Sequence, residues 1–123
     1  MQPLLIIDDD DDLRAALAEI LGAQGHAVQH FADAREALSA LREGLNPSLI
    51  FLDLMMPEMN GWEFRAEQKK DPVLNAIPVL VITARTAGDL RRETLGDVEI
   101  LKKPFSIIEL NDAMERASGS MSD

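Results

Sequence analysis

The sequence predicts an α/β domain built on a five-stranded parallel sheet, and three observations support this prediction. Five short apolar runs occur along the chain, and several are apolar throughout rather than alternating, as in strands that are buried on both faces. Segments with apolar residues at spacings of three and four separate these runs, which is typical of helices that cover a sheet. The chain has 123 residues, a length that suits one domain.

The first half of the chain is predicted to contain two strands and two helices. Pro3 precedes the first apolar run, and Gly22 and Gly25 end the first helical pattern, because glycine is favoured just past a helix C-terminus. Asp33 can cap the second helix by accepting hydrogen bonds from free backbone N–H groups of its first turn. In order, the predicted elements are a strand at 4–7, a helix at 13–21, a strand at 27–31 and a helix from 34 to about 43.

The second half begins with the central strand, Leu49 to Leu52, which places Asp53 at its carboxyl end. A Met-Pro step and then Asn60-Gly61 separate this strand from a third helix, whose apolar face is interrupted by Arg65 and Gln68. The remaining predicted elements are a helix at 62–70, a strand at 78–83, a short polar helix at 87–95, a strand at 98–101 and a helix from about 106 to 116.

Composition and charge exclude several classes of function. The absence of cysteine excludes disulfides, thiolate metal ligands and a thiol nucleophile. The formal net charge of −10 repels phosphate backbones, so we expect a protein partner rather than nucleic acid. Without a membrane-length apolar run or a signal-peptide pattern, we expect a cytoplasmic protein that does not insert into membranes. We expect one domain over 1–117 that stands alone without an output segment, and a frayed tail over 118–123.

Side chains capable of chemistry follow the carboxyl ends of the predicted strands. They are Asp8 and Asp9 after the first strand, Asp53 after the third, Thr83 at the end of the fourth and Lys103 after the fifth. In a doubly wound sheet with the flavodoxin-like order 2-1-3-4-5, the first and third strands flank the ligand crevice, so the three acids meet there. Like charges at this range need a cation, and Mg²⁺ prefers oxygen ligands and a substrate phosphate. Thr83 and Lys103 could then contact a phosphoryl oxygen.

This constellation resembles the receiver domain of two-component response regulators. The matching motifs are Asp8-Asp9, Asp53 within DLMMPEMNG, Thr83-Ala84 and Lys103-Pro104-Phe105, which cover essentially the whole chain in family order. The resemblance implies that Asp53 accepts a phosphoryl group from a histidine kinase or phosphotransfer protein and thereby switches a surface for a downstream protein effector. It implies a phosphoacceptor rather than an enzyme, although one that phosphorylates itself from a donor and slowly loses the phosphate.

The resemblance also implies roles for the other residues of the site. Phosphoryl oxygens would be bound by Lys103 and Thr83, and the Lys103-Pro104 bond would be cis, an isomer that is common only before proline. The ligands of Mg²⁺ would be Asp8, Asp9, Asp53 and the backbone carbonyl of Met55.

Two features depart from the family pattern. Ile100 stands three residues before the lysine, where receiver domains commonly carry an aromatic residue, so the usual ring movement cannot couple the site to the output surface. The segment between Thr83 and Gly96 is short, which predicts a reduced fourth helix and an altered partner face. The resemblance also implies that Met55 and Arg85 flank the phosphorylation site. Because Met55 cannot orient an attacking water and Arg85 can cover the phosphate, we expect slow hydrolysis.

Some of these residues also have simpler interpretations. Asp11-Asp12 are better explained as favourable charges at a helix start. The sequence does not decide whether Asp10 has that role or belongs to the site. For Asp8-Asp9 the position at a strand end favours a metal site. His26 and His30 lie in or beside the second strand and are expected to be surface or packing residues.

Two alternatives to a phosphorylated switch remain. The same domain could serve only as a protein-binding module that is never phosphorylated. A flavin-binding protein of the same fold would need a phosphate-cradling loop after the first strand and aromatic rings to stack on the flavin. The chain has acids at that loop, no tyrosine and a single tryptophan, which disfavours the flavin alternative.

Overall fold

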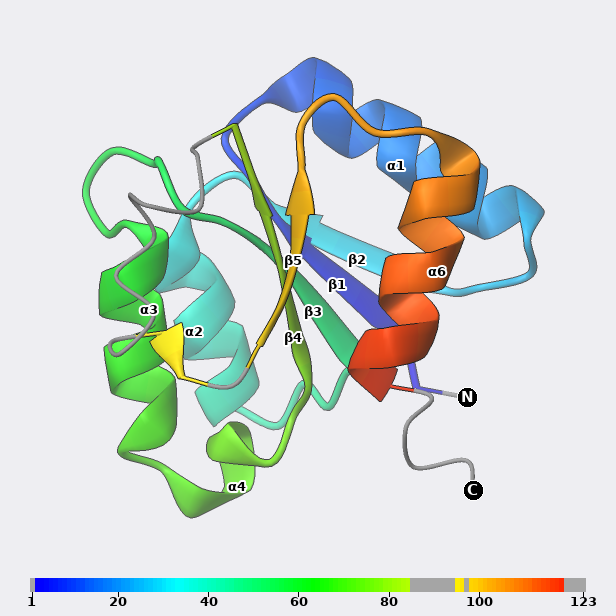
Figure 1. The fold of residues 1–123 in the computed structure, drawn as a ribbon. Coiled ribbons are helices and arrows are strands. Elements are labelled where there is room, and N and C mark those ends of the chain that lie inside the picture. The colour runs from blue at the N-terminus through cyan, green and yellow to red at the C-terminus, as the bar shows by residue number, and fades with distance from the viewer. Residues whose placement is uncertain (1, 85–94, 97, 119–123) are drawn as a thin grey trace.

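Five parallel strands form a single sheet in the computed structural model, which describes residues 2–84, 95, 96 and 98–118. The sheet has the order β2-β1-β3-β4-β5, which confirms the predicted topology (Figure 1). The strands are β1 (Leu4–Ile7), β2 (Val28–Phe31), β3 (Leu49–Asp53), β4 (Val79–Thr83) and β5 (Glu99–Lys102).

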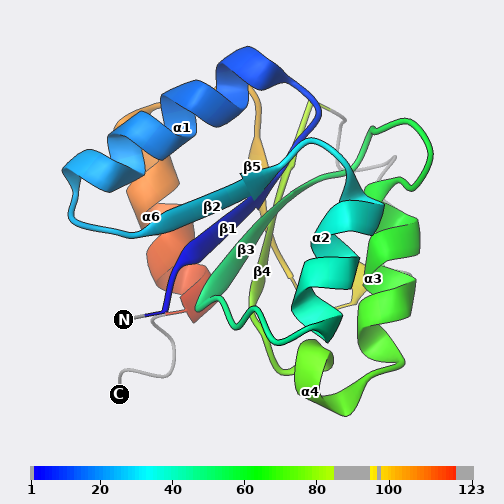
Figure 2. The same cartoon turned by 180° about the vertical axis from the view of Figure 1, so that it is seen from behind.

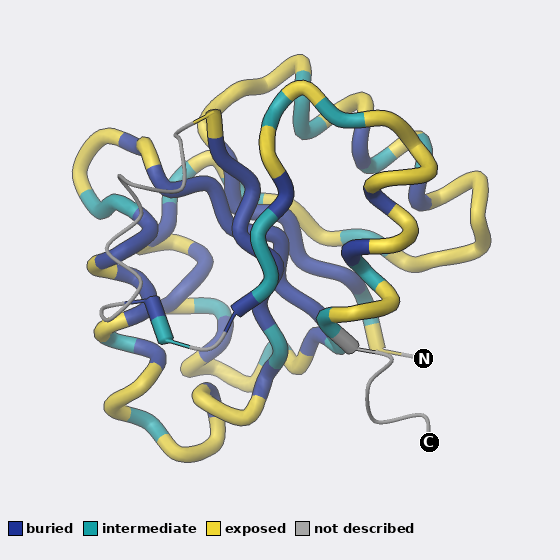
Figure 3. Tube along the Cα trace, in the orientation of Figure 1, coloured by how far each residue is buried: buried dark blue, intermediate teal, exposed yellow. Residues whose placement is uncertain are grey.

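Helices cover both faces of the sheet, as the alternation of strands and helices predicted (Figures 1 and 2). One face carries α1 (Asp11–Ala23) and α6 (Ile107–Ser118), and the other carries α2 (Ala34–Arg42) and α3 (Gly61–Lys69). Successive strand residues point to opposite faces, so Leu5 and Ile7 join the core beneath α2 and α3, while Leu4 and Ile6 join the core beneath α1 and α6. β1, β3 and β4 are buried along their whole length (Figure 3).

One helix start and one short helix differ from the predicted elements, because aspartate side chains there accept hydrogen bonds from backbone amides. α1 begins at Asp11, before the apolar spacing starts, since Asp10 Oδ1 accepts hydrogen bonds of 3.1 Å from the amides of Asp12 and Leu13. A short helix, α4 (Pro72–Asn75), was not predicted. It is capped by Asp71, whose Oδ1 accepts a 2.9 Å hydrogen bond from Val73 N, so one Asp-Pro step ends α3 and starts α4.

The polar residues that interrupt the apolar face of α3 form a buried network. Arg65 Nε donates to the carbonyl of Leu95 at 2.8 Å, and its Nη1 donates to Gln68 Oε1 at 2.6 Å. Gln68 Nε2 in turn donates to the carbonyls of Leu74 and Ile77 at 2.8 and 3.2 Å. These side chains therefore satisfy backbone groups that lie inside the protein, which an apolar residue could not do.

Two predicted features fall largely outside the described residues. Of the predicted helix at 87–95, only Leu95 is described, and its side chain is buried. Of the predicted tail at 118–123, only residue 118 is described, and it ends α6. Within the part of the chain that the structure describes, no helix is long and apolar enough to cross a membrane.

Candidate phosphorylation and metal site

The carboxyl ends of β1 and β3 bring three acids together. The two strands pair with Ile7 beside Leu52, so the next residues, Asp8 and Asp53, emerge next to each other. One carboxylate oxygen from each of Asp8, Asp9 and Asp53 lies within 4.8 Å of the other two. Asp8 and Asp53 are buried and Asp9 is exposed, so the cluster opens to solvent on one side.

Lys103 enters this cluster from the far side of β4. Its backbone amide donates a 2.8 Å hydrogen bond to the carbonyl of Thr83, and the Lys103-Pro104 peptide bond is cis, as predicted. Its Nζ atom lies 3.2 Å from Asp8 Oδ2 and 3.8 Å from Asp53 Oδ1. Thr83 ends β4 and is fully buried. The structure thus gathers the acids and the lysine in one place, with Thr83 at the end of the intervening strand.

Crowding of carboxylates in a buried place changes the acidity of Asp53. Burial, and then the negative charge of Asp8, raise the pKa of Asp53 to about 7. The charge of Lys103 and the 3.4 Å hydrogen bond from the amide of Met55 act in the opposite direction. An added cation would lower this pKa, because it stabilises the ionised carboxylate. Three hard oxygen donors at this spacing fit a divalent cation that prefers oxygen.

The turn after β1 is held by hydrogen bonds of its own. Asp8 Oδ1 accepts a 2.9 Å hydrogen bond from the amide of Asp10, and Asp10 caps α1. The simpler interpretation therefore holds for Asp10, whose side chain serves the helix start. Asp11 and Asp12 lie in the first turn of α1, where negative charge is favourable.

Two residues near the site were not identified from the sequence. Gly61 begins α3 directly against the strand end, and a Cβ atom there would lie 2.7 Å from the carbonyl oxygen of Asp53. Arg14, on α1, donates a 2.8 Å hydrogen bond from Nη1 to the carbonyl oxygen of Asp8. The Asn-Gly pair before α3 was a visible turn signal for Gly61. Nothing in the local pattern distinguishes Arg14 from a solvated helix residue.

The structure places the remaining predicted residues as follows. The side chain of Met55 is about half exposed (52 %) beside the site, while the role of its carbonyl stays a prediction. Arg85 lies outside the described residues. Ile100 is partly buried and packs on the core beneath α2 and α3. His30 is exposed on β2, and His26 is exposed just before that strand. Neither histidine belongs to the acidic cluster.

Known proteins resemble this chain over nearly its whole length. A family model described as the response regulator receiver domain matches residues 4–115. The chain is 37 % identical over 113 residues to the Haemophilus influenzae transcriptional regulatory protein CpxR homolog. It is 36 % identical over 109 residues to the Mycobacterium tuberculosis transcriptional regulatory protein TcrA. These alignments cover 89 % and 87 % of the chain but only 47 % and 42 % of the relatives, so the chain spans less than half of their length.

Solved structures show the same fold. The Vibrio cholerae chemotaxis protein CheY4 aligns with a TM-score of 0.85 at 28 % identity, covering 95 % of this chain and 98 % of that one. The signal receiver domain of a histidine kinase from Syntrophus aciditrophicus aligns with a TM-score of 0.86 at 29 % identity, covering 98 % and 92 %. The sheet order, the acidic cluster and these similarities agree. The chain belongs to the family of response regulator receiver domains.

Proposed function

We propose that Asp53 is the phosphoacceptor of this receiver domain, with a histidine kinase or a phosphotransfer protein as the donor. The observation that supports this proposal best is the meeting of Asp8, Asp9 and Asp53 within 4.8 Å, with Lys103 Nζ 3.8 Å from Asp53 Oδ1. Acids and a lysine in this arrangement can receive a dianionic group, whereas a surface used only for binding would not need it.

Phosphoryl transfer forms one bond to phosphorus and breaks another. An oxygen of the ionised Asp53 carboxylate attacks phosphorus, and the phosphorus–nitrogen bond of the donor phosphohistidine breaks on the opposite side. The imidazole leaves with the bonding electron pair and takes up a proton, and an acyl phosphate remains on Asp53. Positioning and charge neutralisation dominate such a transfer, and Lys103 contributes to both by favouring the ionised form of Asp53.

Mg²⁺ is the cation that we propose for the acidic cluster. Its ligands would be Asp8, Asp9, Asp53 and the backbone carbonyl of Met55, and once bound it offsets negative charge on the phosphoryl oxygens. The ammonium of Lys103 supplies a second positive charge to those oxygens, and the hydroxyl of Thr83 supplies a hydrogen bond.

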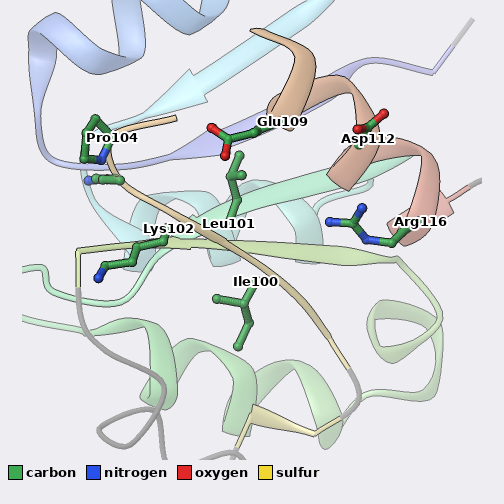
Figure 4. Close-up of a pocket in the computed structure, with 8 residues that line it drawn as sticks. Ile100, Leu101, Lys102, Pro104, Glu109, Asp112 and Arg116 are labelled. Carbon is green, nitrogen blue, oxygen red and sulfur yellow. The ribbon is translucent and has the colours of Figure 1, made fainter. Parts of the chain in front are cut away.

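The new charge on Asp53 would change the conformation of the surface formed by β5 and α6, where a downstream protein effector would bind. A groove of about 570 Å³ lies on this surface between the two elements (Figure 4). Ile100 and Leu101 point from β5 to opposite sides of the strand (Figure 4). Because Ile100 carries no aromatic ring, switching here proceeds by a movement other than the swing of a ring. We place this signalling in the cytoplasm.

Acetyl phosphate provides a direct test because it needs no cognate kinase. The protein is incubated with acetyl phosphate and Mg²⁺, and the intact mass is measured against the variants Asp53→Asn and Asp33→Asn. We expect one phosphoryl group on the wild type and on Asp33→Asn, none on Asp53→Asn, and none for the wild type in excess chelator. Asp33 is a matched control, since it caps α2 and pairs with Arg35 and does not belong to the acidic cluster. Absence of the modification on the wild type would favour the alternative, a binding module that is not phosphorylated.

A further inference from the structure

Arg14 joins three elements of the fold at the acidic end of the sheet. Its Nη1 donates a 2.8 Å hydrogen bond to the carbonyl oxygen of Asp8, at the end of β1. Its Nη2 forms a 2.7 Å ion pair with Asp11 in the first turn of α1, and its Nε donates to His30 Nδ1 on β2 at 3.3 Å. The side chain of Arg14 is only 13 % exposed, so the guanidinium is held among these partners rather than extended into water.

The carbonyl that Arg14 holds belongs to the peptide group between two of the predicted metal ligands. A peptide group is planar, so a hydrogen bond that orients its carbonyl also orients the bonds on either side of it. The carbonyl of Asp8 lies in the peptide that links Asp8 to Asp9. Orienting it therefore constrains ψ of Asp8 and φ of Asp9, and with them the directions in which both carboxylates leave the backbone.

Other hydrogen bonds also hold this turn, besides the contact of Asp8 with Lys103. The amide of Asp8 donates a 3.2 Å hydrogen bond to the carbonyl of Phe31, which ties the turn to β2. Asp8 Oδ1 accepts from the amide of Asp10, which ties the side chain to α1. Among these contacts, the hydrogen bond from Arg14 is the one that acts on the plane of the peptide before Asp9.

We propose that Arg14 is a positioning residue that pre-organises Asp8 and Asp9 for the cation; this inference rests on the proposed function. Its positive charge alone would oppose a cation nearby, because like charges repel. Its geometry favours the cation, because ligands that are already oriented lose less freedom on binding. The two contributions have opposite signs, which makes them separable by substitution.

The test compares Arg14→Lys with Arg14→Met in titration calorimetry with Mg²⁺ alone at constant ionic strength. Lysine keeps the positive charge but lacks the planar guanidinium group. Methionine keeps much of the aliphatic part of the side chain and loses both the charge and the guanidinium group. If Arg14 positions the ligands, Arg14→Lys binds Mg²⁺ about 10-fold more weakly than the wild type, as is typical when a residue that orients metal ligands is lost. Arg14→Met also binds more weakly than the wild type, but less so than Arg14→Lys, because it removes the repulsive charge as well. If Arg14 acts only through its charge, Arg14→Met binds more tightly and Arg14→Lys is unchanged, which would overturn the proposal.

A merely structural role would leave a different signature. The midpoint of urea unfolding would fall while the Mg²⁺ dissociation constant of the folded protein stayed the same, and this result would also overturn the proposal. Arg14→Lys keeps the buried stem and the charge, so its dissociation constant decides the matter should Arg14→Met fail to fold.

Controls separate this proposal from the proposed function. Arg42→Met removes an arginine that pairs with Glu67 at 3.0 Å at the C-terminus of α2, and it should leave Mg²⁺ binding unchanged. A wild type that neither binds Mg²⁺ nor accepts a phosphoryl group contradicts the proposed function itself. A wild type that does both, with Arg14 variants that match it, contradicts only the positioning role.

Discussion

The Nζ atom of Lys103 lies 3.8 Å from Oδ1 of Asp53, although β4 lies between β3, which ends at Asp53, and β5, which ends just before Lys103. The lysine reaches across the end of β4 because β5 delivers it past the edge of the sheet, with its backbone amide bonded to the carbonyl of Thr83. This contact places a positive charge beside a buried carboxylate, and that charge favours the ionised form of Asp53.

Replacing Lys103 by methionine should raise the pKa of Asp53 above its value of about 7, because the nearest cation is lost while burial and Asp8 remain. Carboxyl carbon chemical shifts measured against pH by NMR would follow this change. Lys102→Met is the matched control, since Lys102 is the exposed neighbour at the end of β5. An equal pKa in the wild type and Lys103→Met would contradict the electrostatic role given to Lys103.

The raised pKa of Asp53 predicts how stability depends on pH. The unfolded chain releases this proton near the ordinary pKa of 3.8, and the folded protein releases it near 7. Between these values the folded state binds more protons, so the free energy of unfolding falls as pH rises from about 4 to 7. Asp53→Asn should remove this fall. In urea unfolding with chelator present, the free energy of unfolding of Asp53→Asn should exceed that of the wild type by roughly 2–4 kcal/mol at pH 8 and by little at pH 4.

Added Mg²⁺ gives this pH experiment an internal check. Saturating Mg²⁺ should stabilise the wild type at pH 8 much more than Asp53→Asn, because only the wild type has the full set of carboxylates. Parallel curves of stability against pH for the two proteins, with and without Mg²⁺, would mean that Asp53 is not the group that titrates near pH 7.

A side chain at Gly61 should disturb both the fold and the site. In Gly61→Ala the new Cβ atom would lie 2.7 Å from the carbonyl oxygen of Asp53 and 2.8 Å from Leu54 Cα, so backbone must move. We expect a loss of about 3 kcal/mol in the free energy of unfolding and slower modification by acetyl phosphate. Gly22→Ala is the control, because nothing lies within 4 Å of the Cβ atom that it would add in α1. Its free energy of unfolding should rise by about 0.5–1 kcal/mol. Equal effects of the two substitutions would refute the steric argument.

Breaking the buried hydrogen-bond network of Arg65 and Gln68 should lower the free energy of unfolding. Gln68→Leu is close in size but leaves the carbonyls of Leu74 and Ile77 and one N–H of Arg65 without this partner. We expect the free energy of unfolding to fall by about 2–4 kcal/mol, since each unpaired buried polar group costs roughly 1–3 kcal/mol. Glu67→Gln, on the same helix, weakens only surface ion pairs with Arg42 and Lys70 and should change the free energy of unfolding little. A Gln68→Leu protein as stable as the wild type would show that water or neighbouring groups replace the lost bonds.

The lifetime of the phosphate should depend on Met55. Its thioether is about half exposed beside the site and cannot orient an attacking water, so we expect the wild type to lose its phosphate slowly. Met55→Asn introduces an amide that can orient water and should shorten the lifetime, as measured by intact mass after donor removal. Decay of the wild type within seconds, unchanged in Met55→Asn, would contradict this prediction.

The sequence alone was sufficient for the strands, for their order as that of a flavodoxin-like sheet, and for the residues at their ends. Buried parallel strands are apolar throughout, so a charged residue directly after such a run, as in Asp53, stands out without any knowledge of distances. The polar interruption of α3 by Arg65 and Gln68 was visible in the same way, although its meaning was not. α4 was missed because the apolar pattern does not reveal a single turn that begins at an Asp-Pro step.

Only the tertiary structure decided the through-space relationships. Local periodicity reports which faces of an element are buried, but it carries no information on which distant side chains meet. The 3.2 Å contact of Lys103 with Asp8, the pKa of Asp53 and the reach of Arg14 to the carbonyl of Asp8 all depend on how β1, β3 and β5 lie relative to one another. Sequence thus identified the chemical groups, and packing of the sheet set the distances on which their charges and hydrogen bonds depend.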